Sequence, residues 1–217
     1  MAFSEVYRKQ VELLIRILPF IAQEDCFALN GGTAINLFVR NMPRLSVDID
    51  LTYLPVLPRA ESLAAIDEAM KGIAERIRKS LRGATVTEGA IQPEKAVTKL
   101  LIRVGGVQTK IEVTPVLRGC VHGPELLTVS RSVEETFGFA EVRVVSFADL
   151  YGGKIVAALD RQHPRDLFDV RDLLANEGID ETLPSSFTCL VITDRCSNCW
   201  LRGENPSKLS SAVASKV

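Results

Sequence analysis

Two aspartates, Asp48 and Asp50, lie one residue apart in a segment with the residue pattern of a β-strand. Successive side chains of a strand point to opposite faces, so the two aspartates share one face. The other face is apolar and consists of Val47, Ile49, Leu51 and Tyr53. Carboxylates with Cα atoms about 6–7 Å apart repel each other unless a cation lies between them. Hard divalent ions such as Mg²⁺ prefer carboxylate oxygens. The spacing therefore predicts the metal-binding strand of a site that handles phosphate.

A glycine turn precedes this strand. Gly31, Gly32 and Thr33 join a short β-rich run at 27–29 to an apolar helix expected at about 34–39. Glycines let backbone N–H groups approach a ligand, and a helix N-terminus favours a phosphate. A Gly-Gly pair alone favours a plain strand-to-helix turn. Because the Asp-x-Asp strand follows closely, the pattern predicts a phosphate-binding turn.

Arg40 and Arg44 flank the loop between the turn and the strand. Arginine suits bidentate phosphate contacts, although surface arginines without a ligand are also common. Ser46 directly precedes the strand, where it would orient Asp48 or contact the ligand. We expect these three residues to complete the binding site.

A third acid, Glu112, lies in the second of two β-rich runs, 97–104 and 107–113, which are joined by two glycines. Two glycines between such runs are a strong hairpin signal. If the second run lies beside the Asp-x-Asp strand, Glu112 becomes a third carboxylate, and three acids can hold two Mg²⁺ ions. The alternative is an ion pair between Glu112 and Lys99 or Lys110.

Lys154 follows two glycines inside a helical segment that Ser146 opens as a capping residue. Each glycine costs about 1 kcal/mol relative to alanine within a helix, so something is expected to approach that turn closely. Lys154 is then either a phosphate-binding cation or an exposed lysine.

Asp166 begins another helical segment, in which local pairing along the helix would account for Arg165, Asp169 and Asp172. Asp166 lies outside that ladder of charges. It is therefore the better candidate for a functional acid in this segment.

The whole chain has 217 residues, a net charge of −1 and 47% hydrophobic residues, which suffices for a buried core and gives no global basic field. Any polyanion site must therefore be a local basic patch. We find no run that could span a bilayer and no secretory signal, so the cytoplasm is the expected location. Five scattered cysteines do not form a disulfide framework, and the pair Cys196 and Cys199 lacks the partners of a zinc site.

Hydrophobic periodicity predicts amphipathic helices at 4–18, ended by Pro19, and at 63–81. Residues 84–88 and 141–145 are expected to be strands. From about residue 183 the sequence is polar and lacks a clear period. We expect a core at 1–145, the start of a helical lobe at 146–180 and an irregular tail at 181–217.

Taken in order, the motifs Gly-Gly-Thr-Ala, Arg-Leu-Ser-Val-Asp-Ile-Asp-Leu, Lys-Ile-Glu-Val, Asp-Leu-x-x-Gly-Lys and Arg-Asp-Leu-x-Asp resemble the AbiEii/AbiGii nucleotidyltransferase toxins of bacterial abortive-infection systems. The resemblance covers about residues 8–178. It implies an α+β, polymerase-β-like fold: a mixed sheet flanked by helices and followed by a helical lobe. The departure after Gly178 suggests a truncated or frameshifted end.

The resemblance also implies roles for individual residues. The family's metal-binding Asp-x-Asp and third acid correspond to Asp48, Asp50 and Glu112. Its nucleotide-phosphate turn corresponds to Gly31, Gly32 and Thr33. Residues of its later motifs correspond to Lys154 and Asp166. The implied cofactor is Mg²⁺ or Mn²⁺ and the implied substrate is a nucleoside triphosphate (NTP). The implied acceptor is the 3′ end of tRNA. A cognate antitoxin would be a separately encoded DNA-binding repressor that need not touch the chain.

Three alternatives remain open at this point. A metal-dependent glycosyltransferase also uses Asp-x-Asp, although the early glycine turn and the short N-terminal part oppose it. The chain could instead be a catalytically impaired nucleotide-binding module. Its acceptor could also be a protein rather than RNA.

Overall fold

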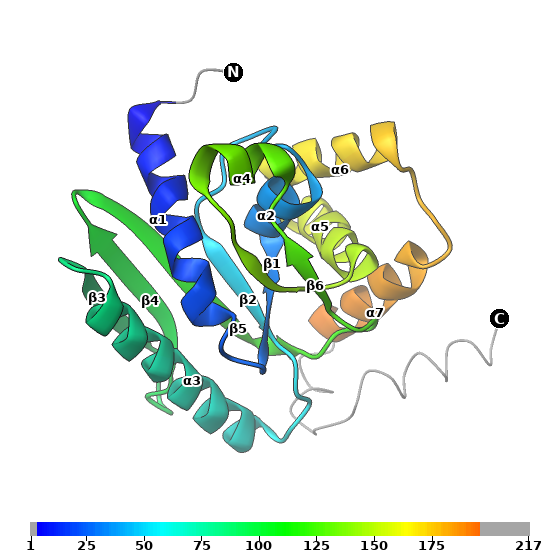
Figure 1. Ribbon diagram of the computed structural model, residues 1–217. Coiled ribbons are helices and arrows are strands. Elements are labelled where there is room, and N and C mark those ends of the chain that lie inside the picture. The colour runs from blue at the N-terminus through cyan, green and yellow to red at the C-terminus, as the bar shows by residue number, and fades with distance from the viewer. Residues whose placement is uncertain (1–3, 196–217) are drawn as a thin grey trace.

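A mixed seven-stranded β-sheet forms the centre of the molecule, in the strand order β3-β4-β5-β2-β1-β7-β6 (Figure 1). The structure is a computed structural model, and it describes residues 4–195. The strands are β1 (Phe27–Asn30), β2 (Ile49–Tyr53), β3 (Thr85–Ala90), β4 (Val97–Val104), β5 (Val107–Arg118), β6 (Glu125–Thr128) and β7 (Glu141–Val144). The pairs β2–β5 and β1–β7 are parallel, and the others are antiparallel. This is the mixed α+β sheet that the sequence predicts.

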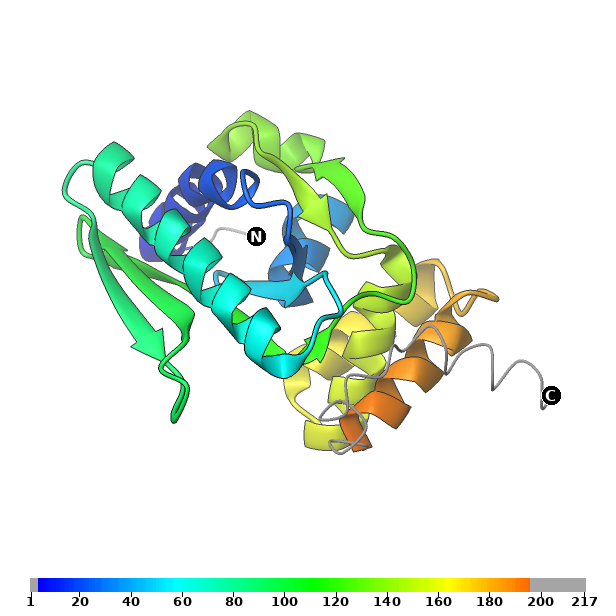
Figure 2. The same cartoon turned by 90° about the horizontal axis from the view of Figure 1, so that it is seen from below.

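Helices cover the sheet in two groups, as Figures 1 and 2 show. The helical segments are α1 (Glu5–Ile21), α2 (Gly31–Ala34), the π-helical η1 (Ile35–Val39), α3 (Arg59–Ser80), α4 (Arg131–Phe137), α5 (Phe147–Arg161), α6 (Pro164–Asn176) and α7 (Leu183–Arg195). The long helix α1 packs on β5 and β7, α3 packs mainly on β4 and β3 near one edge of the sheet, and α5, α6 and α7 gather at the other side of the molecule.

The alternation in β2 decides which side of the sheet is core and which is free for chemistry. Ile49, Leu51 and Tyr53 are at most 3% exposed and belong to the main hydrophobic cluster. Asp50 and Thr52 are only half-buried and line a cleft that α5 also borders. The acidic face of β2 is therefore turned toward the helical lobe.

Two local expectations are confirmed and one is wrong. Gly105 and Gly106 form the β4–β5 hairpin turn, with φ values of +56° and +82°. A strand, β7, is present where residues 141–145 predict one. However, α1 does not end at Pro19 but continues to Ile21. A proline in the last turn removes only one helical hydrogen bond, and burial of Ile21 in the core favours the extra turn.

The C-terminal segment differs from the expected irregular tail, because residues 183–195 form α7 and pack against α5. The close approach predicted at the glycine pair of α5 is real. A Cβ atom on Gly152 would lie 3.1 Å from the backbone nitrogen of Phe187 and 3.1 Å from Cβ of Ser186. The neighbour is a helix rather than a ligand. Cys196 and Cys199 lie outside the described residues.

None of the helices within residues 4–195 combines the length and the apolar character that crossing a membrane requires. The division into a core of 1–145 and a helical lobe of 146–180 stays a prediction.

Candidate active site

The structure brings the three predicted carboxylates to one face of the sheet. Strands β2 and β5 are parallel neighbours in which Asp50 lies opposite Glu112 and Ile49 lies opposite Ile111. Residues in register on adjacent strands point to the same side, and Asp48 lies two residues before Asp50. Glu112 is therefore not turned away from the two aspartates.

The negative charges of this face are incompletely compensated. Burial raises the pKa of the Asp50 carboxyl, and the nearby charges of Asp48 and Glu112 raise it further, against Lys110 and Lys154. The pKa of Glu112 is lowered, mainly by its hydrogen bond from Lys110. The acids thus differ: Glu112 has a cation within hydrogen-bond distance, whereas the half-buried Asp50 has a raised pKa despite the nearby lysines.

Lysines also contact these acids, as the alternative reading of Glu112 requires. Nζ of Lys110 lies 2.7 Å from Oε2 of Glu112 and 3.9 Å from Oδ2 of Asp48. Nζ of Lys99 lies 3.5 Å from Oε1 of Glu112. Glu112 therefore has the ion pairs of the alternative interpretation and also lies where the metal interpretation places a third acid.

Within residues 4–195, no three His, Cys, Asp or Glu side chains lie close enough together to hold a metal ion in their present conformations. The donor set nevertheless suits a hard cation, because it consists of carboxylate oxygens that already attract the ammonium of Lys110. Asp48 and Glu112 are half exposed or nearly so, and their side chains have room to turn. Asp48, Asp50 and Glu112 thus fit Mg²⁺ or Mn²⁺.

The glycine turn packs directly on one of these acids. Gly31 has φ +73°, and a Cβ atom there would lie 2.6 Å from Oδ2 of Asp50. Its N–H donates to the side chain of Asn30 at 2.6 Å, so this donor already has a partner. The Thr33 hydroxyl donates to the backbone carbonyl of Asp48 and contacts the Ser46 hydroxyl at 3.1 Å. The turn is therefore tied to the Asp-x-Asp strand at both ends.

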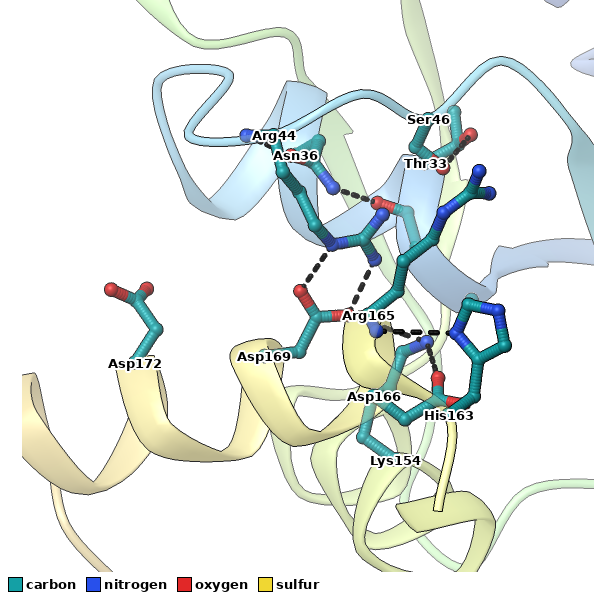
Figure 3. A network of polar contacts seen from close by, with 12 residues as sticks. Thr33, Asn36, Arg44, Ser46, Lys154, His163, Arg165, Asp166, Asp169 and Asp172 are labelled. Atoms are coloured by element: carbon teal, nitrogen blue, oxygen red, sulfur yellow. Dashed lines mark hydrogen bonds and ion pairs between the residues drawn. The ribbon is translucent and has the colours of Figure 1, made fainter. Parts of the chain in front are cut away.

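The two arginines expected to bind phosphate are paired with acids of the helical lobe. Nε of Arg44 donates to Oδ1 of Asp169 at 2.6 Å, and a second guanidinium N–H donates to the other oxygen (Figure 3). Arg40 donates to Asp172 at 2.7 Å and to Glu177 at 2.6 Å. Both guanidinium groups therefore join the core to α6 and the residue just after it. Phosphate binding by either arginine stays a prediction.

Arg44 also passes over the turn. A Cβ atom on Gly32 would lie 2.5 Å from its guanidinium and 2.9 Å from Oγ of Ser46. Gly32 is therefore needed for packing between the turn, the loop and α6, whether or not a ligand binds.

Lys154 and Asp166 form a buried ion pair. Nζ of Lys154 lies 2.7 Å from Oδ1 of Asp166 and 3.3 Å from Oδ2 of Asp169, and both acids are 1% exposed (Figure 3). Asp166 also accepts from Arg161 at 2.7 Å. Burial alone would raise the pKa of Asp166, but its hydrogen bonds with Arg161 and Lys154 lower it overall.

The expected charge ladder along α6 is wrong. Asp169 and Asp172 pair across elements, with Arg44 and Arg40, rather than with Arg165 on their own helix. Sequence reasoning therefore missed Asp169, since its spacing has a plausible local explanation. It also gave Lys110 no role beyond pairing, although period-two alternation places Lys110 on the same face as Glu112.

A cleft of about 410 Å³ lies between the sheet and α5. Its lining includes Gly31, Asp50, Lys154 and Arg161. A smaller hollow beside α1 is lined by Asp48 and Ser46. The predicted turn, one predicted carboxylate and the predicted lysine therefore share one cleft.

The fold is that of a nucleotidyltransferase. The chain is similar to MenT4, a nucleotidyltransferase toxin from Mycobacterium tuberculosis, with a TM-score of 0.64 and 18% sequence identity over 87% of this chain. It spans 64% of the length of that protein. A second match, the solution structure of the antibiotic-resistance factor ANT(2'')-Ia, has 17% identity over 95% of this chain and 94% of that one. Its TM-score of 0.36 is too low to add to the argument.

Residues 12–207 of the chain match the sequence model of a protein family, the nucleotidyl transferase AbiEii toxins of type IV toxin–antitoxin systems. The chain belongs to this family. A search of curated proteins found no match. Because the family match continues to residue 207, the departure expected after Gly178 is wrong.

Proposed function

We propose that this chain transfers a nucleotide from an NTP to an acceptor hydroxyl at the 3′ end of tRNA and releases pyrophosphate. In this reaction the acceptor oxygen bonds to the α-phosphorus as the bond to the β-phosphate oxygen breaks. The observation that supports the proposal most directly is the register of Asp50 opposite Glu112, with Asp48 on the same face. On this view the chain is the toxin of a cytoplasmic abortive-infection system that acts against phage, and a separate repressor is its antitoxin.

The proposed site divides its work between charge neutralisation and positioning. Asp48, Asp50 and Glu112 would hold Mg²⁺ or Mn²⁺, which when bound supplies positive charge to the triphosphate and favours ionisation of the acceptor hydroxyl. The turn at Gly31 lies against Asp50 and would seat the triphosphate beside those acids. Lys154 lines the same cleft, where its ammonium offsets charge that builds on the phosphates.

A nucleotide-binding module without transfer is the second candidate. The ammonium of Lys110 contacts Glu112 at 2.7 Å, and this favours an acid cluster that is already neutralised by the protein. Family membership opposes the other alternative, an Asp-x-Asp glycosyltransferase.

Each of the four NTPs, labelled at the α-phosphate, should be incubated with the chain, Mg²⁺ and either total tRNA or cell extract. We expect label on RNA, dependent on Mg²⁺ and lost on chelation. Label on protein would mean that the acceptor is a protein rather than RNA. No label on either would favour the nucleotide-binding module.

The same assay tests the site with Asp48→Ala and Asp50→Ala. Both variants should lose transfer while keeping the circular-dichroism spectrum of the folded chain. Asp25→Ala is the matched control, because Asp25 is 87% exposed and pairs with Arg143 at the other end of the β1–β2 pair. Unchanged activity in either cluster variant would reject the assignment.

A further inference from the structure

Four charged side chains form a square on one face of the β2–β5 pair. Ile49 lies opposite Ile111 and Asp50 opposite Glu112. The residues before these isoleucines, Asp48 and Lys110, are therefore neighbours on the same face as Asp50 and Glu112. We call Asp48, Asp50, Lys110 and Glu112 the sheet cluster. It contains three acids and one cation.

Lys110 is held within this cluster rather than exposed beside it. Its side chain is 28% exposed, and its Nζ lies 2.7 Å from Glu112 and 3.9 Å from Asp48. Burial alone would lower the pKa of Lys110, but its hydrogen bond to Glu112 and the surrounding carboxylates raise it overall. The ammonium is therefore charged at any physiological pH, and its role does not depend on titration.

We propose that Lys110 is a tethered counter-cation, which partly neutralises the carboxylates in the metal-free chain and must be displaced when a divalent ion binds them. The inference rests on the proposed function, since it assumes that these acids are the metal site. It adds that the chain supplies a competitor for its own metal and thereby sets the metal concentration needed for loading.

The physical basis is competition of two cations for the same oxygens. A divalent ion on Asp48 and Glu112 would lie within a few ångströms of the present position of Nζ, and like charges at that separation repel strongly when partly shielded from water. Metal binding must therefore break the contact between Lys110 and Glu112. Without Lys110, by contrast, three carboxylates would repel each other in the metal-free state.

Lys99 provides a matched control for this effect. It comes from the neighbouring strand β4, and its Nζ lies 3.5 Å from Glu112. Its side chain is 47% exposed, and it pairs with Glu112 at the margin of the square. Removal of Lys99 changes the net charge as much as removal of Lys110, but it leaves the cation between Asp48 and Glu112 in place.

The test measures Mn²⁺ and Mg²⁺ binding to the full chain by calorimetry in the absence of nucleotide, together with thermal unfolding. Lys110→Met should bind Mn²⁺ at least about tenfold more tightly than the wild type, because the competing charge is gone. Its metal-free melting temperature should fall, and added Mn²⁺ should raise that temperature more than in the wild type. Lys99→Met should change the affinity by less than about threefold, and Lys110→Arg, which keeps the charge, should remain near the wild type.

Equal or weaker Mn²⁺ binding by Lys110→Met, with normal binding by the wild type, would overturn the inference and leave the proposed function standing. Absence of Mn²⁺ binding by the wild type, both alone and with an NTP added, would overturn both. If Lys110→Met is insoluble, Lys110→Gln keeps a hydrogen-bond donor to Glu112 and gives the same comparison.

Discussion

Two groups of charged residues each contribute side chains to the cleft, Asp50 from one and Lys154 and Arg161 from the other, and they differ in burial and in charge balance. The sheet cluster is half exposed, and its acids outnumber its single lysine. The second group, which we call the lobe network, consists of Arg44, Lys154, Arg161, Asp166 and Asp169. Asp166 and Asp169 are each 1% exposed, and each contacts two cations.

The difference separates a group whose acids outnumber the protein's cations from a group whose acids all have cationic partners. Every acid of the lobe network has partners from the protein, so its charges hold α5, α6 and the loop after η1 together. In the sheet cluster, burial raises the pKa of Asp50, and its acidic neighbours raise it further. Residues of the same types therefore stabilise the fold in one place, whereas in the other we propose that they bind a divalent cation.

Asp169→Asn tests the lobe network and should have the largest effect. Loss of this carboxylate leaves Arg44 and Lys154 short of a buried partner, which typically costs about 3–5 kcal/mol of unfolding free energy. Urea unfolding measures the change. A loss below about 1 kcal/mol would contradict a structural role for the network.

Asp50→Asn makes the same substitution in the sheet cluster, where we expect the opposite effect on stability. Transfer should fall at least about a hundredfold, because one of the charges that position the substrates is lost. Stability at neutral pH should stay the same or rise. A raised pKa means that the folded chain binds this proton more tightly than the unfolded chain, so ionised Asp50 costs stability as pH rises from its unfolded pKa through its folded pKa.

The measurement combines the labelling assay with urea unfolding at neutral pH and at about pH 4. The stability gain of Asp50→Asn over the wild type should shrink toward the acidic pH, because protonation of the wild-type carboxyl removes the cost of its charge. If Asp50→Asn were destabilised as much as Asp169→Asn, the contrast between the two groups would be lost.

Glu177→Gln should have a smaller effect, of about 1 kcal/mol in unfolding free energy. Glu177 is 38% exposed, and its partner Arg40 keeps a second contact with Asp172. The hydrogen bond from Arg40 lowers the pKa of Glu177. Its contribution is therefore fully present above its unfolded pKa of about 4.3 and is lost as pH falls through the folded value.

A comparison of wild type and Glu177→Gln by urea unfolding across this acidic range checks the prediction. Added salt should reduce the difference, because the pair is partly exposed to solvent. A difference that persisted at low pH would mean that the charge of Glu177 is not its source.

Arg131→Ala defines the lower limit of the series. Arg131 pairs with Glu135 one turn further along α4, but the two side chains are 91% and 63% exposed. We expect a change below about 0.5 kcal/mol. A larger change would show that exposed pairs also matter in this chain, and it would reduce the contrast between buried and exposed charges.

Local pattern sufficed to predict the three acids of the sheet cluster, because alternation along β2 and the Gly105-Gly106 hairpin fix which side chains share a face. The neighbouring position of Glu112 followed from a single assumption about strand order, which the structure confirms. The lobe network could not be predicted in this way. Arg44 and Asp169 are 125 residues apart, and nothing local in the sequence marks them as partners.

The last helix was missed for a similar physical reason. The segment that forms α7 lacks a clear hydrophobic period, and its packing depends on the absence of a side chain at Gly152 on another helix. Sequence pattern indicated that a neighbour approaches Gly152 but not which one. Tertiary contact, not local propensity, decides the structure there.

No side chain separates Gly31 from the carboxylate of Asp50, since even a methyl group would collide with it. A triphosphate on that turn would therefore place anion against anion at contact distance. On the proposed binding mode, the chain alone would hold free nucleotide poorly, and a divalent ion and the nucleotide would each strengthen the binding of the other. Thermodynamic linkage then makes the coupling reciprocal, so the glycine turn converts two weak ligands into one cooperative pair.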